Sequence, residues 1–457
     1  MAIETFGGPE IVDGQPEFTG NTVIIDLGLD RNEPETYARP TRSTVPDWFG
    51  PLILAATVLF GTSASAAPPP PPLTPLLSIQ VSPADSYAVT ETGQLLAQTV
   101  GTLTSYAMAD GRRQWRSGTP APTYRLRSGS GVLLLRPWAL GPGEPTTTAV
   151  DLATGRVRWR HTGTVLTVPG SSALLAVTGV RTPTTTAGRR IDGPVQSLDP
   201  ATGRVLWQVD TPGGAVLLTV PGPAGSPPRL ALIRDDRTLT VDDLGTGAQL
   251  AATTLPEADY GADNPALSGG LLLVRHATRW GVTLSAYDPV TLAVRWERPG
   301  YAAYDAAPCG PLTCLTGPDG VQAVDPATGV LRWSQPEWMG LEQRGDMVLA
   351  YRSPGGTDLV GIVDPVSGRV RTDLRGWRTL GTSAIDDDLP SADVVLVTRA
   401  IAPGARTMVA VARAGEARPR VLAELPEGTG DCQAVPERLI CRSASGELNL
   451  WAYRTKG

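Results

Sequence analysis

The stretch Leu198-Asp-Pro-Ala-Thr-Gly-Arg-Val-Leu-Trp207 decides the fold, because the chain repeats it. Close copies run over residues 150–159 and 324–333, and weaker ones over 287–296 and 363–372. A shortened copy over 109–115, a degraded one over 241–247 with Asp242 as its aspartate, and an eroded one at 411–415 bring the number to eight. Successive copies lie 37 to 49 residues apart, which is typical of one four-stranded propeller blade.

Each position of the unit has a physical reason. Asp begins a turn because its carboxylate accepts bonds from the amides just ahead, and Gly takes the positive φ that closes the hairpin. The Arg-Val-x-Trp that follows alternates between the two faces of a half-buried strand, and the Trp ring fills the gap between neighbouring sheets. We therefore predict structural roles for these repeat residues: Asp110, Trp115, Asp151, Trp159, Asp199, Trp207, Asp288, Trp296, Asp325, Trp333 and Asp364.

Composition agrees with many short strands. The chain has 51 Gly and 43 Pro in 457 residues, too many helix breakers for a helical protein. The net charge is −6, which argues against a nucleic-acid-binding protein, because such proteins normally carry a basic patch.

The unit LDPATGRVLW resembles the repeat of the PQQ-like family of propellers, which includes quinoprotein alcohol dehydrogenases and the assembly lipoprotein BamB. The resemblance covers roughly residues 77–457 and implies an all-β propeller. The spacing of the copies predicts eight blades, with seven as the alternative. Because residues 446–452 (GELNLWA) echo residues 101–107 (GTLTSYA), the last strand is expected to complete a blade with the first and so remove the open edges.

The part before the propeller is predicted to contain three segments. Residues 1–47 form an acidic, disordered cytoplasmic tail, since residues 1–48 hold nine acids and three arginines. Residues 48–67 are uncharged from Phe49 onward and are expected to form a single transmembrane signal-anchor, with a cleaved signal peptide as the alternative. Residues 68–76, with five consecutive prolines, are expected to form a stalk. Arginines before the segment predict a cytoplasmic N-terminus and an extracytoplasmic propeller at the plasma membrane.

The four cysteines are arranged as Cys309-x4-Cys314 and Cys432-x8-Cys441, each pair bracketing an expected hairpin. Two local disulfides suit an exported domain, and free buried thiols are the alternative. A zinc site would need other spacings or more histidines than His161 and His276.

A catalytic site is not expected. In quinoprotein dehydrogenases the family pattern implies a calcium-bound quinone in the central funnel, with adjacent disulfide-linked cysteines and with Asp, Glu and Asn as ligands. Here no two cysteines are adjacent, and only four Asn occur in the chain. The acidic run Asp386-Asp387-Asp388 is expected to be a solvated loop, with cation binding as the alternative.

The sequence therefore predicts a non-catalytic scaffold without cofactor that binds a protein or cell-envelope partner at the cell surface. Two alternatives are a PQQ-dependent dehydrogenase with calcium and a transmembrane sensor.

Overall fold

The computed structural model describes the chain in thirteen stretches, and the statements below concern these residues: 46–63, 71–82, 85–99, 101–118, 124–137, 146–178, 188–223, 226–259, 263–353, 358–380, 394–401, 406–426 and 428–454. They belong to two compact units, residues 1–69 and residues 70–457. The predicted acidic tail falls almost entirely outside the described residues, and so does the run Asp386-Asp387-Asp388.

The described residues of the first unit contain one helix, α1 (Phe49–Ser63), of 15 residues. At a rise of about 1.5 Å per residue it is roughly 22 Å long, whereas the hydrocarbon core of a bilayer is about 30 Å thick. No helix among the described residues is both long and apolar enough to span a membrane. The prediction of a transmembrane helix over residues 48–67 is therefore wrong.

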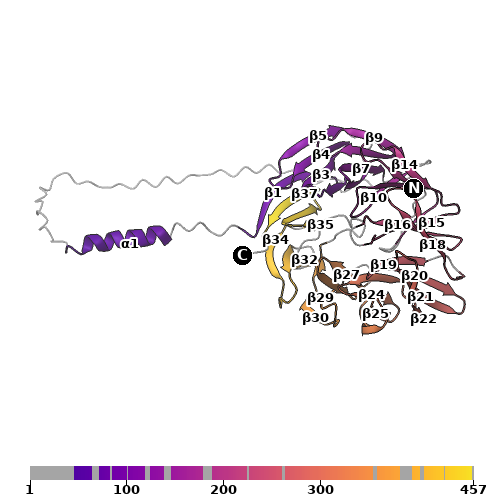
Figure 1. Ribbon diagram of the computed structural model, residues 1–457. Coiled ribbons are helices and arrows are strands. Elements are labelled where there is room, and N and C mark those ends of the chain that lie inside the picture. The colour runs from indigo at the N-terminus through magenta and orange to yellow at the C-terminus, as the bar shows by residue number, and fades with distance from the viewer. Residues whose placement is uncertain are drawn as a thin grey trace, which may run out of the picture. The chain divides into compact units, whose positions relative to one another are not determined.

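The second unit is a ring of antiparallel sheets, which we number as blades 1 to 9 in chain order (Figure 1). Blade 1 consists of β2 (Tyr87–Val89), β3 (Gln94–Thr99), β4 (Thr102–Ala107) and β5 (Arg113–Gly118). Blade 2 consists of β6 (Tyr124–Gly129), β7 (Val132–Pro137), β8 (Thr146–Asp151) and β9 (Val157–Thr162). Blade 3 consists of β10 (Thr164–Thr167), β11 (Leu174–Val177), β13 (Val195–Leu198) and β14 (Val205–Val209).

Blade 4 consists of β15 (Ala215–Val220), β16 (Arg229–Arg234), β17 (Thr238–Asp243) and β18 (Gln249–Thr254), with β12 (Arg189–Ile191) paired to β15 as a fifth strand. Blade 5 consists of β19 (Asp263–Ser268), β20 (Leu271–Thr278), β21 (Gly281–Tyr287) and β22 (Val294–Pro299). Blade 6 consists of β23 (Asp305–Cys309), β24 (Leu312–Gly317), β25 (Gly320–Val324) and β26 (Leu331–Gln335).

Blade 7 consists of β27 (Gly340–Arg344), β28 (Met347–Tyr351), β29 (Leu359–Val363) and β30 (Val370–Asp373). Blade 8 consists of β31 (Arg378–Thr379), β32 (Val395–Ala400), β33 (Thr407–Ala412) and β34 (Arg420–Leu425). Blade 9 consists of β35 (Thr429–Val435), β36 (Arg438–Ser443), β37 (Glu447–Tyr453) and β1 (Leu73–Gln80).

Nine sheets among the described residues make nine blades, so the prediction of eight blades, and its alternative of seven, is wrong. Each copy of the repeat forms the turn between the third and fourth strands of a blade. In blade 9 these strands are β37 and β1, which come from opposite ends of the ring sequence. No turn can join them, so counting turns finds eight copies and misses the ninth blade.

The expected closure of the ring by the two ends is present. β1 pairs antiparallel with β37 from Leu73 opposite Tyr453 to Gln80 opposite Glu447, and Figure 1 shows the indigo and yellow strands together. β1 begins at Leu73, so residues 73–76 of the predicted stalk lie in this strand.

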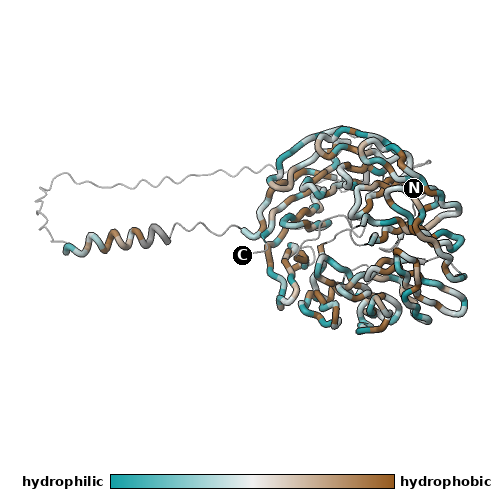
Figure 2. Tube along the Cα trace, in the orientation of Figure 1, coloured by the Kyte–Doolittle hydropathy of each residue, from teal (hydrophilic) through white to brown (hydrophobic). Residues whose placement is uncertain are grey.

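The core lies between the faces of adjacent blades. One cluster, for example, joins Leu96 and Leu103 of blade 1 to Leu133 and Val150 of blade 2. The middle strands carry runs of buried residues, whereas the fourth strand lies at the outer edge and is largely exposed in blades 1 to 7. Figure 2 shows hydrophobic residues recurring along the strands around the ring.

Candidate functional site

The aspartates of the repeat organise the turns between the third and fourth strands. Asp288 Oδ1 accepts the backbone N–H groups of Val290 and Thr291, both at 2.9 Å. Asp151, Asp199, Asp325 and Asp364 accept the same pair of amides in their blades. Asp110, in the shortened copy, accepts the amide of Arg112 at 3.0 Å. These carboxylates are thus engaged in building turns.

An arginine seven residues after the aspartate adds an ion pair in four blades. Arg332 Nη2 lies 2.6 Å from Asp325 Oδ2, and Arg158, Arg295 and Arg371 reach their aspartates in the same way. The bond from Arg295 is the main reason that the pKa of Asp288 falls to about 2. The four aspartates paired with arginine therefore stay ionised at neutral pH, as a turn acceptor requires.

In blade 4 the turn aspartate is Asp243, one residue beyond the position predicted from the degraded copy. Asp243 Oδ1 accepts the amides of Gly245 and Thr246 at 3.0 and 2.8 Å. Asp242 is buried within β17, and burial raises its pKa. The adjacent aspartates in the sequence are ambiguous, and only the sheet register separates them.

In five blades the tryptophan of the repeat joins the blade to the next one. Trp296 of blade 5 donates from Nε1 to the carbonyl oxygen of Pro326 in the turn of blade 6, at 2.9 Å. Its ring covers Gly329 of that turn so closely that a Cβ there would lie 2.7 Å from the ring. We call this arrangement the tryptophan clasp, and it recurs at Trp115, Trp159, Trp207 and Trp333.

Four blades lack a tryptophan at this position, and in blades 4 and 7 the seam is filled in another way. Blade 4 carries Ala251, and the turn of blade 5 carries Leu292 at φ 57° where the other turns carry Gly, so that the two residues pack in one cluster. Blade 7 carries Thr372, whose hydroxyl donates to the carbonyl of Arg413 at 2.9 Å.

Both predicted disulfides are present. Cys309 and Cys314 link β23 to β24, and Cys432 and Cys441 lie directly opposite each other on β35 and β36. Each disulfide therefore joins two neighbouring strands of one blade.

The two histidines lie on strands. His161 is on β9 and is partly exposed, whereas His276 on β20 is 4% exposed. Nδ1 of His276 lies 3.0 Å from Nη2 of Arg237. Since a guanidinium can only donate, Nδ1 must be the acceptor, and the imidazole is neutral. Burial and, secondly, Arg237 lower the pKa of His276.

The described side chains do not fit a calcium-bound quinone. Within the described stretches no three His, Cys, Asp or Glu side chains converge as metal ligands would. The disulfides join cysteines five and nine residues apart rather than adjacent ones.

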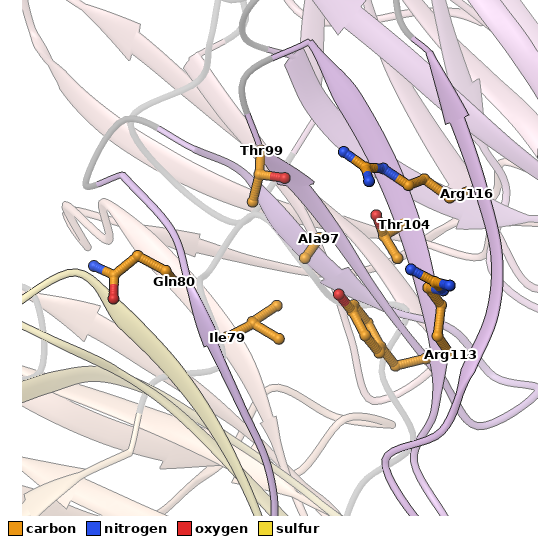
Figure 3. Close-up of a pocket in the computed structure, with 8 residues that line it drawn as sticks. Ile79, Gln80, Ala97, Thr99, Thr104, Arg113 and Arg116 are labelled. Carbon is orange, nitrogen blue, oxygen red and sulfur yellow. The ribbon is translucent and has the colours of Figure 1, made fainter.

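Two clefts open between blades in the described part of the ring. The first, which we call the closure cleft, encloses about 280 Å³ between β1 and the outer part of blade 1. It is lined by Ile79, Gln80, Ala97, Thr99, Thr104, Tyr106, Arg113 and Arg116. In Figure 3, Arg113 and Arg116 extend on either side of Thr104, across from Ile79 and Gln80.

The second cleft encloses about 420 Å³ between blades 6 and 7. Two of its three arginines are paired with acids: Arg352 Nη2 lies 3.1 Å from Glu337 Oε2, and Arg375 pairs with Asp373. The guanidinium groups of these two arginines are thus already engaged. The side chain of the third, Arg369, makes no ion pair within the described residues.

Polar contacts beside the β1–β37 pairing hold blade 9 to blade 1. Arg442 Nη2 donates to the carbonyl of Asp85 at 2.6 Å, and Tyr87 donates to the carbonyl of Asp431 at 2.9 Å. Arg438 Nε donates to the carbonyl of Met108 at 2.6 Å.

Sequence reasoning missed the closure cleft, because its walls come from β1 and from β3 to β5, whose contact depends on ring closure. One signal was available in the sequence. Arg113 stands near the start of an outer strand, where the strong copies of the repeat have Val or Leu.

Comparison with known families gives one match. Residues 191–340, about a third of the chain, match the PQQ-like family model described as outer membrane protein assembly factor BamB. Among curated proteins, no sequence matches the chain.

Solved structures with a similar fold are distant in sequence. BamB from Moraxella catarrhalis is 16% identical, with 84% of this chain and 99% of that chain covered and a TM-score of 0.41. The designed protein Ika8 is 13% identical, with 83% and 99% covered and a TM-score of 0.43. A quinohemoprotein alcohol dehydrogenase from Pseudomonas putida is 16% identical, with 58% and 61% covered and a TM-score of 0.37.

Over residues 191–340, therefore, the chain carries the repeat of the PQQ-like, BamB-type propellers, as the resemblance of the motif predicts.

Proposed function

We propose that this protein is a non-catalytic propeller scaffold, without a quinone cofactor, that binds protein partners outside the cytoplasm. The observation that carries the proposal is a belt of exposed aliphatic side chains on the outer strands. We define the aliphatic belt by the residue that begins, or nearly begins, the fourth strand in six blades: Val157, Val205, Val294, Leu331, Val370 and Val421. Each is 41 to 51% exposed.

The belt lies beside open strand edges. In each sheet the fourth strand has a hydrogen-bonded neighbour on one side only. An outer strand with exposed aliphatic residues and free backbone groups suits a partner that adds a strand or lays an apolar segment across the rim. The same exposed aliphatic position recurs in six blades, whereas single apolar residues on an ordinary protein exterior are scattered.

The other observations agree with this proposal. The aspartates and tryptophans of the repeat are occupied by turns and clasps, and residues 191–340 match a family described as an assembly factor. Two disulfides support a location outside the cytoplasm, because disulfides persist in oxidising compartments.

The test is site-specific photo-crosslinking in the native host. A photoreactive residue at Leu331 or Val370 is expected to give discrete protein adducts, and one at the exposed Arg156, in a turn, serves as the control. The adduct is then identified, and the purified partner is titrated against the wild type and against Leu331→Ser/Val370→Ser, which should weaken binding at least fivefold. Equal crosslinking at all three sites, or equal affinity of the variant, would contradict the proposal.

A second measurement addresses the quinone alternative directly. Purified protein is titrated with PQQ and calcium while tryptophan fluorescence and dye reduction with alcohols are followed. No saturable response is expected. Saturable quenching accompanied by dye reduction would overturn the non-catalytic assignment.

A further inference from the structure

The closure cleft contains two arginines that a bulge brings to the same face of blade 1. Residues three apart on a regular strand point to opposite faces. Here Arg113 pairs with Tyr106, Trp115 pairs with Ser105 and Arg116 with Thr104, so Gln114 is the extra residue. The bulge therefore turns Arg113 and Arg116 to the side that faces β1, and Trp115 to the side that faces blade 2.

Arg113 departs from the chain's own repeat. It occupies the position that holds a member of the aliphatic belt in six blades, and Gln249 occupies that position in blade 4. Blade 1 thus interrupts the belt with a cation. Charge at this position is not needed to build a blade, because the blades with Val or Leu there form the same four-stranded sheet.

The closure cleft lies at a seam without a clasp. In the clasped seams a tryptophan covers the turn glycine, whereas over Gly111 lie the carbonyl of Leu76 and the Cβ of Leu77, from β1. The cleft opens in the same seam, between Ile79 and Gln80 on one wall and the two arginines on the other.

The charge in the closure cleft is not compensated. Within the described structure neither Arg113 nor Arg116 makes a hydrogen bond or an ion pair, and no carboxylate lines the cleft. The neighbouring Arg112, by contrast, pairs with Asp110 at 3.3 Å, and the arginines Arg352 and Arg375 of the second cleft pair with acids.

We propose that the closure cleft binds a carboxylate side chain of an acidic peptide segment on a partner protein. This inference rests on the proposed scaffold function and names the chemistry of one contact. The two guanidinium groups supply charge-assisted donors to one carboxylate, and the hydroxyl groups of Thr104, Thr99 and Tyr106 lie in the same cleft.

The lining of the cleft favours a peptide over a free small anion. Its volume of about 280 Å³ accommodates one side chain of a larger ligand. Ile79, Ala97 and the ring of Tyr106 add apolar surface beside the arginines, which a peptide of alternating acidic and aliphatic residues would cover.

The test uses the full chain and a hexapeptide of alternating Glu and Val, labelled with a neutral dye and followed by fluorescence anisotropy. Arg113→Val, which installs the residue found in the belt, should weaken binding at least fivefold, and Arg113→Val/Arg116→Gln at least tenfold. Arg112→Gln removes the same charge from the adjacent, paired residue and should change affinity less than twofold. Binding should also weaken when salt is raised from 50 to 300 mM.

Several outcomes would overturn the inference. These are equal loss with Arg112→Gln, equal binding of the peptide with Gln in place of Glu, or full displacement by millimolar inorganic phosphate, which would make the site one for small oxyanions. Thermal unfolding of each variant at the wild-type temperature shows that the fold is intact. If the belt crosslinks persist while the peptide fails to bind, the scaffold function stands and only this inference falls.

Discussion

At the scale of single residues, the tryptophan clasp joins two kinds of interaction in one side chain. The indole ring buries a large apolar area, and its N–H satisfies a carbonyl in the turn of the next blade. The glycine beneath the ring is required twice over, because its φ is positive and because a Cβ would enter the ring. Each clasp therefore adds a hydrogen bond and buried apolar area to the contact between two blades.

We expect Trp296→Ala to lower the free energy of unfolding by about 3–5 kcal/mol, since Trp296 is buried and its removal leaves a cavity. Trp296→Phe should cost less, because most of the ring remains. Trp280→Ala is the matched control in the same blade, since Trp280 is 84% exposed, and should change stability by less than about 0.5 kcal/mol. Urea unfolding measures all three, and equal effects at Trp280 and Trp296 would contradict the clasp.

His276 predicts a pH dependence of stability. Burial and Arg237 lower its pKa in the folded state, while Glu297 opposes the shift. The unfolded chain therefore binds more protons below about pH 6.5, so the stability present above that pH is lost as the pH falls further. His276→Gln keeps an acceptor for Arg237 and should flatten the dependence between pH 7 and pH 5, as measured by urea unfolding. An unchanged slope would show that His276 does not carry the effect.

At the scale of elements, the seam between blades 4 and 5 reverses the sizes of the two residues that meet in a clasp. A small residue, Ala251, faces a large one, Leu292, where a large Trp faces Gly in the clasps. Leu292 keeps the positive φ of the glycine, which costs of order 1 kcal/mol and indicates that the turn itself is unchanged.

This exchange can be reversed by mutation. Ala251→Trp alone should destabilise by about 1–3 kcal/mol through overpacking, and Leu292→Gly alone by about 2 kcal/mol or more through a cavity. The double variant should recover most of both losses, because it rebuilds a clasp. A double-mutant cycle from urea unfolding should give a coupling of at least about 1 kcal/mol, whereas simple additivity would show that the two sites do not face each other.

Elements built from contiguous residues could be predicted from the sequence. The turn aspartates, the clasp tryptophans and the cysteine hairpins each depend on spacing within about ten residues, and spacing is visible in one chain. Asp243 was missed because two aspartates adjoin, and only pairing with β18 distinguishes them. The closure cleft was missed because Ile79 and Arg113 become neighbours only after the ring closes.

At the scale of the whole molecule, the ninth blade shows a limit of counting repeats. The motif marks a turn, and blade 9 has its strands in place without that turn. A ring closed between the third and fourth strands of one blade therefore contains one blade more than the number of turns of this kind in its sequence.

The contribution of β1 can be measured by truncation. Removing residues 1–72 leaves the pairing of β1 with β37 intact and should change the melting temperature by less than about 2 °C. Removing residues 1–80 deletes β1 and exposes Leu448 and Leu450 of β37, so the melting temperature should fall by at least about 10 °C. Thermal unfolding followed by circular dichroism compares the two, and equal stability would mean that the ring does not depend on its first strand.

The closure of the ring also sets an order of events during biosynthesis. Gln80 and Ser445, which share a hydrogen bond, are 365 residues apart. At about 5–20 residues per second, the ribosome needs roughly 20–75 s to make the strand that pairs with β1. Throughout that time the nascent chain carries β1, an apolar strand whose pairing partner β37 has not been synthesised. A chaperone that recognises unpaired apolar strands would therefore have more time to bind β1 than to bind a strand that pairs with its neighbour in sequence.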